Sequence, residues 1–466
     1  METPTEKKKK REVPLKISIG FAVGEISDMI AYQGFSFLIF TFYFSLVKLP
    51  TETITLVFIL WSIFNAFNDP ILGAMSDRTK TKKFGGGRRR PWIVAMLIPL
   101  PAVMFFLFTP PLGNTTLSAI YFFIIICLFD TFYTAYSLNH TSLYPEMFPT
   151  DSQRETVGGA RRILMVIGLI IAFILPGFVI KDLTFQNEDP VTFTEYKIMG
   201  IIFGVLILIT MLIHLKFGIK EPSVDELEKK ETLSFWKSLT TTLKNAKFIV
   251  LAIASTMNWY VFGLLPMIIP IYATFVLGMD NSLLISSLLL IAFLSSIPGV
   301  LIWIKVDSKL GSKNTFIIST IVWIISFIPF IFITEYWMAA ITMIFVGFGL
   351  GGAPFLLDLN ISNIIDEDEL QTNQRREASY YGIHALLIRL STIMTILSVG
   401  FILNTNGWRV YDPDTVTPDL IFGLQSLMSF FPAGALLISL IFLGLFPLNK
   451  KRVEEIHKKK LELHNI

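Results

Sequence analysis

The stretch that decides the fold is residues 61–92, which reads W-S-I-F-N-A-F-N-D-P-I-L-G-A-M-S-D-R-T-K-T-K-K-F-G-G-G-R-R-R-P-W. Its first half is apolar enough to cross a membrane, yet it carries Asn65, Asn68 and Asp69. An ionisable group at membrane depth is costly and usually functional, and Asn65 and Asp69, one helical turn apart, share a helix face. The second half is a short loop with seven basic residues, which is typical of the cytoplasmic side. This stretch therefore predicts a membrane-spanning helix with a buried carboxylate, followed by a loop on the cytoplasmic side.

Composition supports a polytopic membrane protein. Of the 466 residues, 53% are hydrophobic and only 16% are charged, which excludes an ordinary soluble domain. The net charge of +3 could suggest a nucleic-acid partner, but the basic residues lie in short loops between apolar spans, so membrane topology explains them better. The lone Cys127 lies in an apolar run, which argues against a disulfide, a thiol catalyst or a cysteine metal site. We therefore expect no cofactor and no nucleic-acid partner.

Twelve apolar spans are long enough to form membrane helices of about 20 residues. The third covers residues 91–111, and the longest polar interruption, 216–247, separates six spans from six. The sequence thus predicts an all-α membrane protein with twelve transmembrane helices in two six-helix bundles. The expected parts are an N-terminal tail (1–16), an N-terminal bundle (17–217), a linker (218–246), a C-terminal bundle (247–447) and a C-terminal tail (448–466).

Lysine and arginine are distributed unequally between the two sides of this arrangement. The side of the termini holds 34 of the 39, the other side holds four, and Arg389 falls within a span. Because cytoplasmic loops carry the excess of Lys and Arg, we expect both termini in the cytoplasm. The predicted protein is a multi-pass, monomeric protein of the cell membrane, with the lipid bilayer and a small solute as its partners.

The two halves repeat a loop after their second span. The first copy, residues 73–80, reads G-A-M-S-D-R-T-K, and the second, residues 307–313, reads D-S-K-L-G-S-K. With Gly73, Asp77 and Arg78, the first copy resembles the cytoplasmic loop motif of the major facilitator superfamily. In that motif, charges join helix ends and separate as the two halves rock. The alternative for either copy is a solvated basic turn.

Three stretches resemble a narrower family. They are F-N-A-F-N-D-P-I-L-G (64–73), S-L-Y-P-E-M-F-P-T-D-S-Q-R-E (142–155) and I-I-D-E-D-E-L-Q-T-N-Q-R-R-E-A (364–378). All three are similar to the glycoside–pentoside–hexuronide:cation symporters, the family of the melibiose permease. The resemblance implies the major facilitator fold and a sugar-type substrate moved together with a cation. The gate residues that it implies in the third stretch are Asp366, Arg375, Arg376 and Glu377.

The same resemblance implies a cation site on the second and fourth helices. Asp69 matches one of its carboxylates, whereas Asn65 and Ser137 stand where sodium-using members have acids. Thr134 and Tyr133 match polar positions beside the site. Because Na⁺ needs several oxygens and net negative charge, we expect H⁺ as the coupling ion ahead of Na⁺.

Two further charged residues belong to this expected site. Asp130 precedes Thr134 by one helical turn and lies on the same face, so it can supply the missing carboxylate and restore Na⁺ binding. The alternative for Asp130 is a structural hydrogen-bonding role. Arg389 aligns with a basic residue that in the family lies near the cation site. We expect it to pair with Asp69, because a buried base in a membrane rarely lacks an acid.

The expected substrate ligands come from both halves. Asp28 lies near the place where the family has a sugar-binding acid, and Glu25 stands three residues before it. Aromatic faces can stack on sugar rings while polar groups bind hydroxyls. The remaining candidates of these kinds are Tyr32, Tyr133, Arg162, Asn258 and Trp259.

Other polar residues within spans are expected to have structural roles. His140 and His384 each lack other metal-ligand types nearby, so a bond to a neighbouring helix is expected of them. His214, close to a helix end, is expected at the membrane interface. Three residues near the end of the tenth span are expected to anchor a gate or loop: Asp358, Asn360 and Asn363.

Three classes of function are compared with these features because each would place different residues in the membrane spans. We favour a secondary transporter that moves a small solute, a sugar or glycoside, by alternating access with cation symport; a lysolipid or other amphiphile is the alternative substrate. A membrane enzyme is not supported, since the sequence has no nucleophile constellation, P-loop or metal-ligand spacing. A transport-dead sensor stays open because two family carboxylates are replaced.

Overall fold

The computed structural model describes residues 13–79, 87–148, 150–220, 241–372 and 376–463. Within these ranges the long elements are all helical. The N-terminal half consists of α1 (Leu15–Ala22), α2 (Gly24–Thr41), η1 (Phe42–Leu46), α3 (Thr51–Arg78), α4 (Arg90–Ala95), α5 (Pro99–Phe106), α6 (Thr115–Met147), α7 (Asp151–Val179), α8 (Val191–Ile213) and η3 (His214–Gly218). The C-terminal half consists of α10 (Ala246–Phe275), α11 (Ser282–Leu310), α12 (Ser312–Phe327), η5 (Ile328–Ile331), α13 (Tyr336–Thr372), α14 (Glu377–Thr405), α15 (Pro418–Met428), α16 (Phe430–Leu445) and α17 (Lys450–Leu463).

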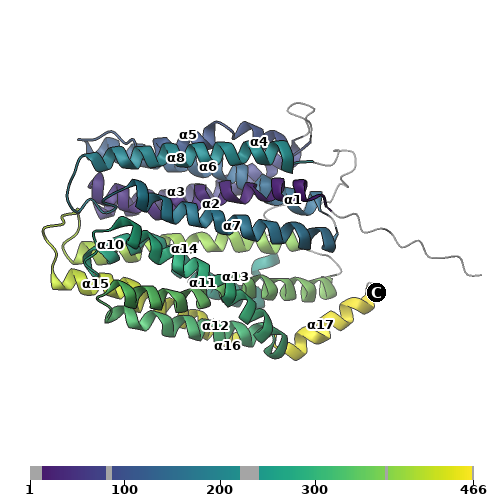
Figure 1. Cartoon of the computed structure of the whole chain (residues 1–466). Coiled ribbons are helices and arrows are strands. Elements are labelled where there is room, and N and C mark those ends of the chain that lie inside the picture. The colour runs from purple at the N-terminus through teal and green to yellow at the C-terminus, as the bar shows by residue number, and fades with distance from the viewer. Residues whose placement is uncertain (1–12, 80–86, 149, 221–240, 373–375, 464–466) are drawn as a thin grey trace, which may run out of the picture.

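The two halves lie side by side with their helices nearly parallel (Figure 1). The purple-to-teal helices form one bundle and the green-to-yellow helices form the other. Helices α1 and α17 lie at the same end of the molecule, at the right of Figure 1. We call this the terminal end, and the opposite end the distal end. The linker residues 221–240 lie outside the described residues.

Eleven helices of the described chain are long and apolar enough to cross a membrane. The exception among the predicted spans is the third, because residues 91–111 form two short helices, α4 and α5. Pro99 starts α5, and because proline has no backbone N–H it cannot donate the hydrogen bond that would continue α4. The prediction of a continuous helix at 91–111 is therefore wrong, whereas the all-helical fold is confirmed.

Helix α3 has the polarity of a membrane helix, with apolar side chains outside and polar ones inside. Phe67 is 67% exposed and Ile63 is 50% exposed, whereas Asn65 is 1% exposed and Asn68 is 8% exposed. In a soluble protein this arrangement would be reversed. Lipid is therefore the solvent that suits the outer face, and the amides of α3 must find partners within the bundle.

Small residues let the helices of the C-terminal half approach closely. A Cβ atom at Gly351 of α13 would lie 2.4 Å from the carbonyl oxygen of Ser296 on α11, and one at Gly347 would lie 1.9 Å from Ser295 Oγ. Glycines four residues apart on one face are a common device for packing membrane helices. They fix α11 against α13, and both of these helices line the central cavity described below.

Hydrogen bonds join the two halves at the distal end. Ser282 Oγ, at the start of α11, donates to the carbonyl of Lys181 at 2.8 Å and accepts from the backbone N–H of Leu183 at 3.1 Å. The backbone N–H of Thr51 donates to the carbonyl of Arg409 at 2.8 Å, and the Arg409 guanidinium pairs with Glu52. The distal end is therefore held closed in this conformation.

Candidate functional site

A cavity of about 1320 Å³ lies between the two halves. Its walls come from α2, α3, α6 and α7 on one side and from α10, α11, α13 and α14 on the other. Because each half supplies one wall, a relative movement of the halves changes access to the cavity. A solute bound here would contact both halves at once.

Aromatic rings cover much of the two walls. On the N-terminal side the rings of Tyr32 and Tyr133 stack at a centroid distance of 5.3 Å. On the C-terminal side Trp259 lies 5.1 Å from Phe262. All four residues line the cavity, so flat apolar surfaces with polar edges face each other across it.

An ion pair crosses between the halves beside this cavity. Arg389 Nη2 of α14 lies 2.5 Å from Asp69 Oδ2 of α3, and about a quarter of each side chain is exposed. The other carboxylate oxygen of Asp69 accepts from Thr134 Oγ1 at 2.9 Å. The structure thus brings Thr134 and Arg389, two of the residues that the sequence grouped with Asp69, into contact with it, although their role in transport stays a prediction.

Asp130 of α6 forms the second half of this polar cluster. It is 4% exposed, it lines the cavity, and its two oxygens accept from Asn65 Nδ2 at 2.8 Å and from Asn68 Nδ2 at 3.1 Å. Asn65 therefore faces Asp130 and not Asp69, although Asn65 and Asp69 lie on the same helix, α3. With two carboxylates and the single guanidinium of Arg389, the cluster has a net charge of −1 when all three are ionised.

No hydrogen bond between Ser137 and Asp69 is seen among the described residues, and the predicted place of Ser137 in the cation site stays a prediction. Ser137 and Tyr133 are instead the hydroxyl groups that interact with Asp28 of α2. The reason is helical rotation: along α6 the side that meets α3 is not the side that meets α2. Asp28 Oδ1 is buried and has no hydrogen-bond partner among the described residues.

The predicted substrate ligands divide into two groups. Four of them line the cavity: Tyr32, Tyr133, Arg162 and Trp259. Three do not: Asp28, Glu25 and Asn258. Glu25 is paired with Arg161 of α7 and with His140 of α6, and Asn258 Nδ2 donates to Ser439 Oγ of α16 at 2.8 Å. Adjacent residues on a helix point about 100° apart, which is why Trp259 faces the cavity while its neighbour Asn258 faces α16.

Several residues at the cavity were missed or misplaced by the sequence analysis. Asp358, expected at a gate, lines the cavity, as do Trp61 and Thr392. The signal for Asp358 was present, because Gly351, Pro354 and Asp358 recur at helical spacing and all face the cavity. Asn360 has the expected structural role, since it accepts from Ser312 Oγ at 3.0 Å.

The loop motif of the N-terminal half lies at the terminal end. Asp77 pairs with Arg89 at 2.6 Å, and Arg88 pairs with Glu146 of α6 at 2.5 Å. Gly73 lies on α3, where an added Cβ would lie 3.6 Å from Leu138 Cδ1, an ordinary contact distance. Arg78, the last residue of α3, is exposed.

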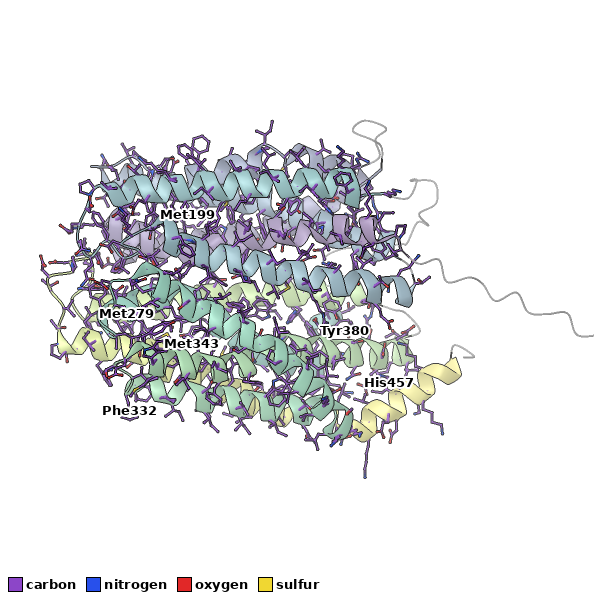
Figure 2. The ribbon with its side chains drawn as sticks, in the orientation of Figure 1. Met199, Met279, Phe332, Met343, Tyr380 and His457 are labelled. Atoms are coloured by element: carbon purple, nitrogen blue, oxygen red, sulfur yellow. The ribbon has the colours of Figure 1, made fainter. Side chains whose placement is uncertain are left out.

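The acidic run at the end of α13 has partners on α10 and α17 and at Arg376, the residue just before α14. Asp366 pairs with Lys460 of α17 at 2.5 Å, and Glu367 pairs with Lys247 of α10 and, at 3.2 Å, with Arg452 of α17. Asp368 accepts from Arg376 Nε at 2.8 Å, and this bond raises the pKa of Arg376. Figure 2 shows His457 of α17 at the same end as Tyr380 of α14. Two predicted gate residues remain: Glu377 is exposed at the start of α14, and Arg375 lies outside the described residues.

These features together define a class of protein. Paired helical bundles with a cavity between them, a charge pair across it and one closed end are the arrangement of an alternating-access membrane transporter. The comparisons with known proteins identify the family. Residues 20–450 match the family described as MFS/sugar transport protein, and the chain therefore belongs to this family.

Individual relatives are distant but nearly full length. The chain is 20% identical to the sodium-dependent lysophosphatidylcholine symporter 1-A of Danio rerio, over 99% of this chain and 91% of the relative. It is 24% identical to a putative sulfoquinovose importer of Escherichia coli strain K12, over 96% and 94%. Among solved structures it is similar to the nucleoside transporter NupG, with a TM-score of 0.66, 16% identity, and 93% and 99% coverage. The protein is accordingly a multi-pass membrane transporter.

Proposed function

We propose that the protein moves a sugar or glycoside across the cell membrane together with a cation, by alternating access. The observation that carries this proposal is the cavity itself, in which aromatic rings and polar side chains from both halves face one space beside a charge pair that joins the halves. A solute in this place and a cation at Asp69 and Asp130 would act on the same contact between the halves.

The lining supports a sugar-type substrate. Tyr32, Tyr133 and Trp259 offer ring faces and polar edges, and Arg162 and Asp358 offer a hydrogen-bond donor and an acceptor. Hydroxyl-rich rings bind best where flat apolar surface and convergent polar groups occur together. The volume of about 1320 Å³ exceeds the roughly 300–1000 Å³ of usual ligand pockets, so a glycoside fits with water around it.

The coupling ion that we propose is a proton. Asp69, Asp130 and Arg389 together carry one negative charge in excess, which one monovalent cation neutralises. Both oxygens of Asp130 accept from amide N–H groups, whereas Na⁺ requires oxygen atoms pointing towards it. A proton needs no such cage. Binding at this cluster would weaken the Asp69–Arg389 pair and allow the halves to separate at that point.

The excess of Lys and Arg on the side of the termini also supports an orientation of the protein in the membrane. We propose that the terminal end, with α17 and the basic loop after α3, faces the cytoplasm. The closed distal end then faces outward. The acidic run on α13, held by α10, α17 and Arg376, would stabilise the terminal end of the C-terminal half. We propose a monomer as the working unit.

A lysolipid is the second candidate substrate, and α7 supplies the observation in its favour. Ile163 and Met165 line the cavity while being 65% and 39% exposed, so α7 offers apolar surface for an acyl chain. Uptake into proteoliposomes of radiolabelled glycosides and of lysolipids, with and without a pH gradient, separates the two. Concentrative uptake of a glycoside supports the proposal, and uptake of lysolipids alone overturns it.

A further inference from the structure

A buried cluster of ionisable groups lies in the N-terminal half, outside the cavity. It consists of Glu25 on α2, His140 on α6, His214 in η3 and Arg161 on α7. Glu25, His140 and His214 are 7%, 1% and 0% exposed, and His214, which was expected at the membrane interface, is thus fully buried. Burying ionisable groups is costly unless they pair, so this cluster requires an explanation that neither the cavity nor the cation site provides.

We propose that Glu25, His140 and His214 form a proton-binding site that holds one imidazolium inside the N-terminal half at neutral pH. The ligand is a proton, and the site is distinct from the cluster of Asp69 and Asp130. It does not rest on the proposed function, because it can be tested without any substrate.

The argument is a count of protons along a chain of hydrogen bonds. His214 Nδ1 lies 3.2 Å from the carbonyl oxygen of Gly20, which can only accept, so this nitrogen carries a proton. His140 Nδ1 lies 3.2 Å from His214 Nε2, and His140 Nε2 lies 3.0 Å from Glu25 Oε1. Each of these three contacts needs one proton. Two neutral imidazoles supply two protons and an ionised carboxylate supplies none. The hydrogen-bonded row from Gly20 to Glu25 therefore holds one proton more than two neutral imidazoles supply.

The contacts of Glu25 place the additional proton on the imidazoles. Arg161 Nε donates to the same Glu25 oxygen that faces His140, and a guanidinium is always charged, so the carboxylate is held in its ionised, accepting form. Asp28, one turn further along α2, also interacts with Glu25 and His140. If Asp28 is ionised, two carboxylates balance Arg161 and one imidazolium, and the buried group is neutral overall.

The remaining neighbours do not disturb this balance. On α6, the Tyr136 hydroxyl donates to the carbonyl of Gly24 at 2.9 Å and the Tyr144 hydroxyl donates to the carbonyl of Arg154 at 2.7 Å. From α1 and η3, the nearest charges are Lys16 and Lys216, and both lie over the ring of Phe217. No further acid or base is therefore needed to account for the hydrogen bonds that run from Gly20 through His214 and His140 to Glu25.

The backbone around the cluster is shaped to hold the rings in place. Helices α1 and α2 are separated at Val23, and a Cβ at the following Gly24 would lie 2.6 Å from His140 Cε1. His214 opens η3, a π-helical turn, and such turns occur often at functional sites. The Phe21 ring stacks on the His140 ring at 5.0 Å. The rings of His140 and His214 are thus fixed at hydrogen-bonding distance from each other.

The direct test is solid-state nuclear magnetic resonance of the full chain in lipid bilayers with ¹⁵N-labelled histidine. The chain has five histidines, and an unperturbed one would be only about 3% protonated at pH 8. We expect one imidazolium signal at pH 8 in the wild type. The signal should be lost in His140→Gln and in Glu25→Gln, because the amide introduced by the second substitution can donate to a neutral His140. A wild type with only neutral imidazoles at pH 8 would overturn the proposal.

Two matched controls locate the proton. His384 is also buried, but among the described residues its Nε2 contacts the Ser255 hydroxyl at 2.7 Å and no acid, so His384→Gln should leave the imidazolium signal unchanged. His457 lies 3.8 Å from Asp366. An imidazolium signal that survives His140→Gln but disappears in His457→Gln would assign the proton to α17 and refute the site.

A stability measurement provides an independent readout. A folded state that binds more protons than the unfolded state loses stability as pH rises. The melting temperature of the wild type in detergent should therefore fall between pH 7 and pH 9 more steeply than that of Glu25→Gln. Equal slopes for the two proteins would contradict the proposal, whatever the absolute stability of the variant.

Discussion

The ion pair between Asp69 and Arg389 makes a quantitative prediction about stability. Replacing Arg389 by Ala leaves Asp69 with the Thr134 hydroxyl as its described hydrogen-bond donor, beside the second carboxylate of Asp130. The excess negative charge of the cluster then rises from one to two. Replacing Asp69 as well by Asn returns the excess to one. The double variant should therefore be more stable than Arg389→Ala alone.

The size of the effect follows from the exposure of the pair. Breaking a fully buried pair costs about 3–5 kcal/mol, while exposed pairs contribute about 0–1 kcal/mol. The side chains of Arg389 and Asp69 are 26% and 27% exposed, so an intermediate coupling energy of about 2 kcal/mol is expected. The pair of Arg409 and Glu52 also joins the halves but is 70% and 46% exposed, and its coupling should stay below about 1 kcal/mol.

A double-mutant cycle measures this coupling directly. The unfolding free energies of the wild type, Arg389→Ala, Asp69→Asn and the double variant are compared in one detergent at pH 7. The Arg409–Glu52 pair is treated in the same way as the control. If the double variant is no more stable than Arg389→Ala, the two residues are not energetic partners and the charge count is wrong.

Three further predictions follow from the same structure. Asp69→Asn should abolish gradient-driven accumulation while the protein stays folded, and undiminished concentrative uptake by this variant would remove Asp69 from the mechanism. Wild-type uptake should collapse with a proton ionophore and ignore Na⁺ at fixed pH; stimulation by Na⁺ would reverse the assignment and make Asp130 the first residue to test. Gly351→Ala should lower stability by about 1–3 kcal/mol, because its Cβ meets the Ser296 carbonyl at 2.4 Å, whereas Gly434→Ala, with open space around it, should not; equal stability of the two variants would refute the close packing.

The fold could be predicted because its signals are local. Apolar length and the unequal distribution of Lys and Arg act on each segment separately, and lipid enforces them strictly. The one misjudged span, residues 91–111, contains Pro99 and Pro101, and a hydropathy pattern does not register the break that a proline makes. That information was in the sequence but required backbone chemistry to extract it.

The candidate site could be predicted only where one physical requirement links distant residues. A base within a membrane span needs an acid, and this rule, together with the family resemblance that puts Arg389 near the cation site, joined Arg389 to Asp69 across the two halves. No such rule connects Glu25 to Arg161 and His140, because several acids and bases in the N-terminal half could have paired differently. Their partners depend on how far α2, α6 and α7 are rotated against one another, which short-range periodicity does not determine.

Helix α6 shows how these separate polar groups fit one structure. It presents Asp130 and Thr134 to α3, where they contact Asn65 and Asp69, and it presents His140 to Glu25 of α2. Because the two sets of contacts lie on different sides of one helix, we expect a substitution on one side to leave the hydrogen bonds of the other side intact. Ion coupling at Asp69 and Asp130 and proton binding at His140 are therefore separate hypotheses. An experiment that supports or refutes one of them does not depend on the other.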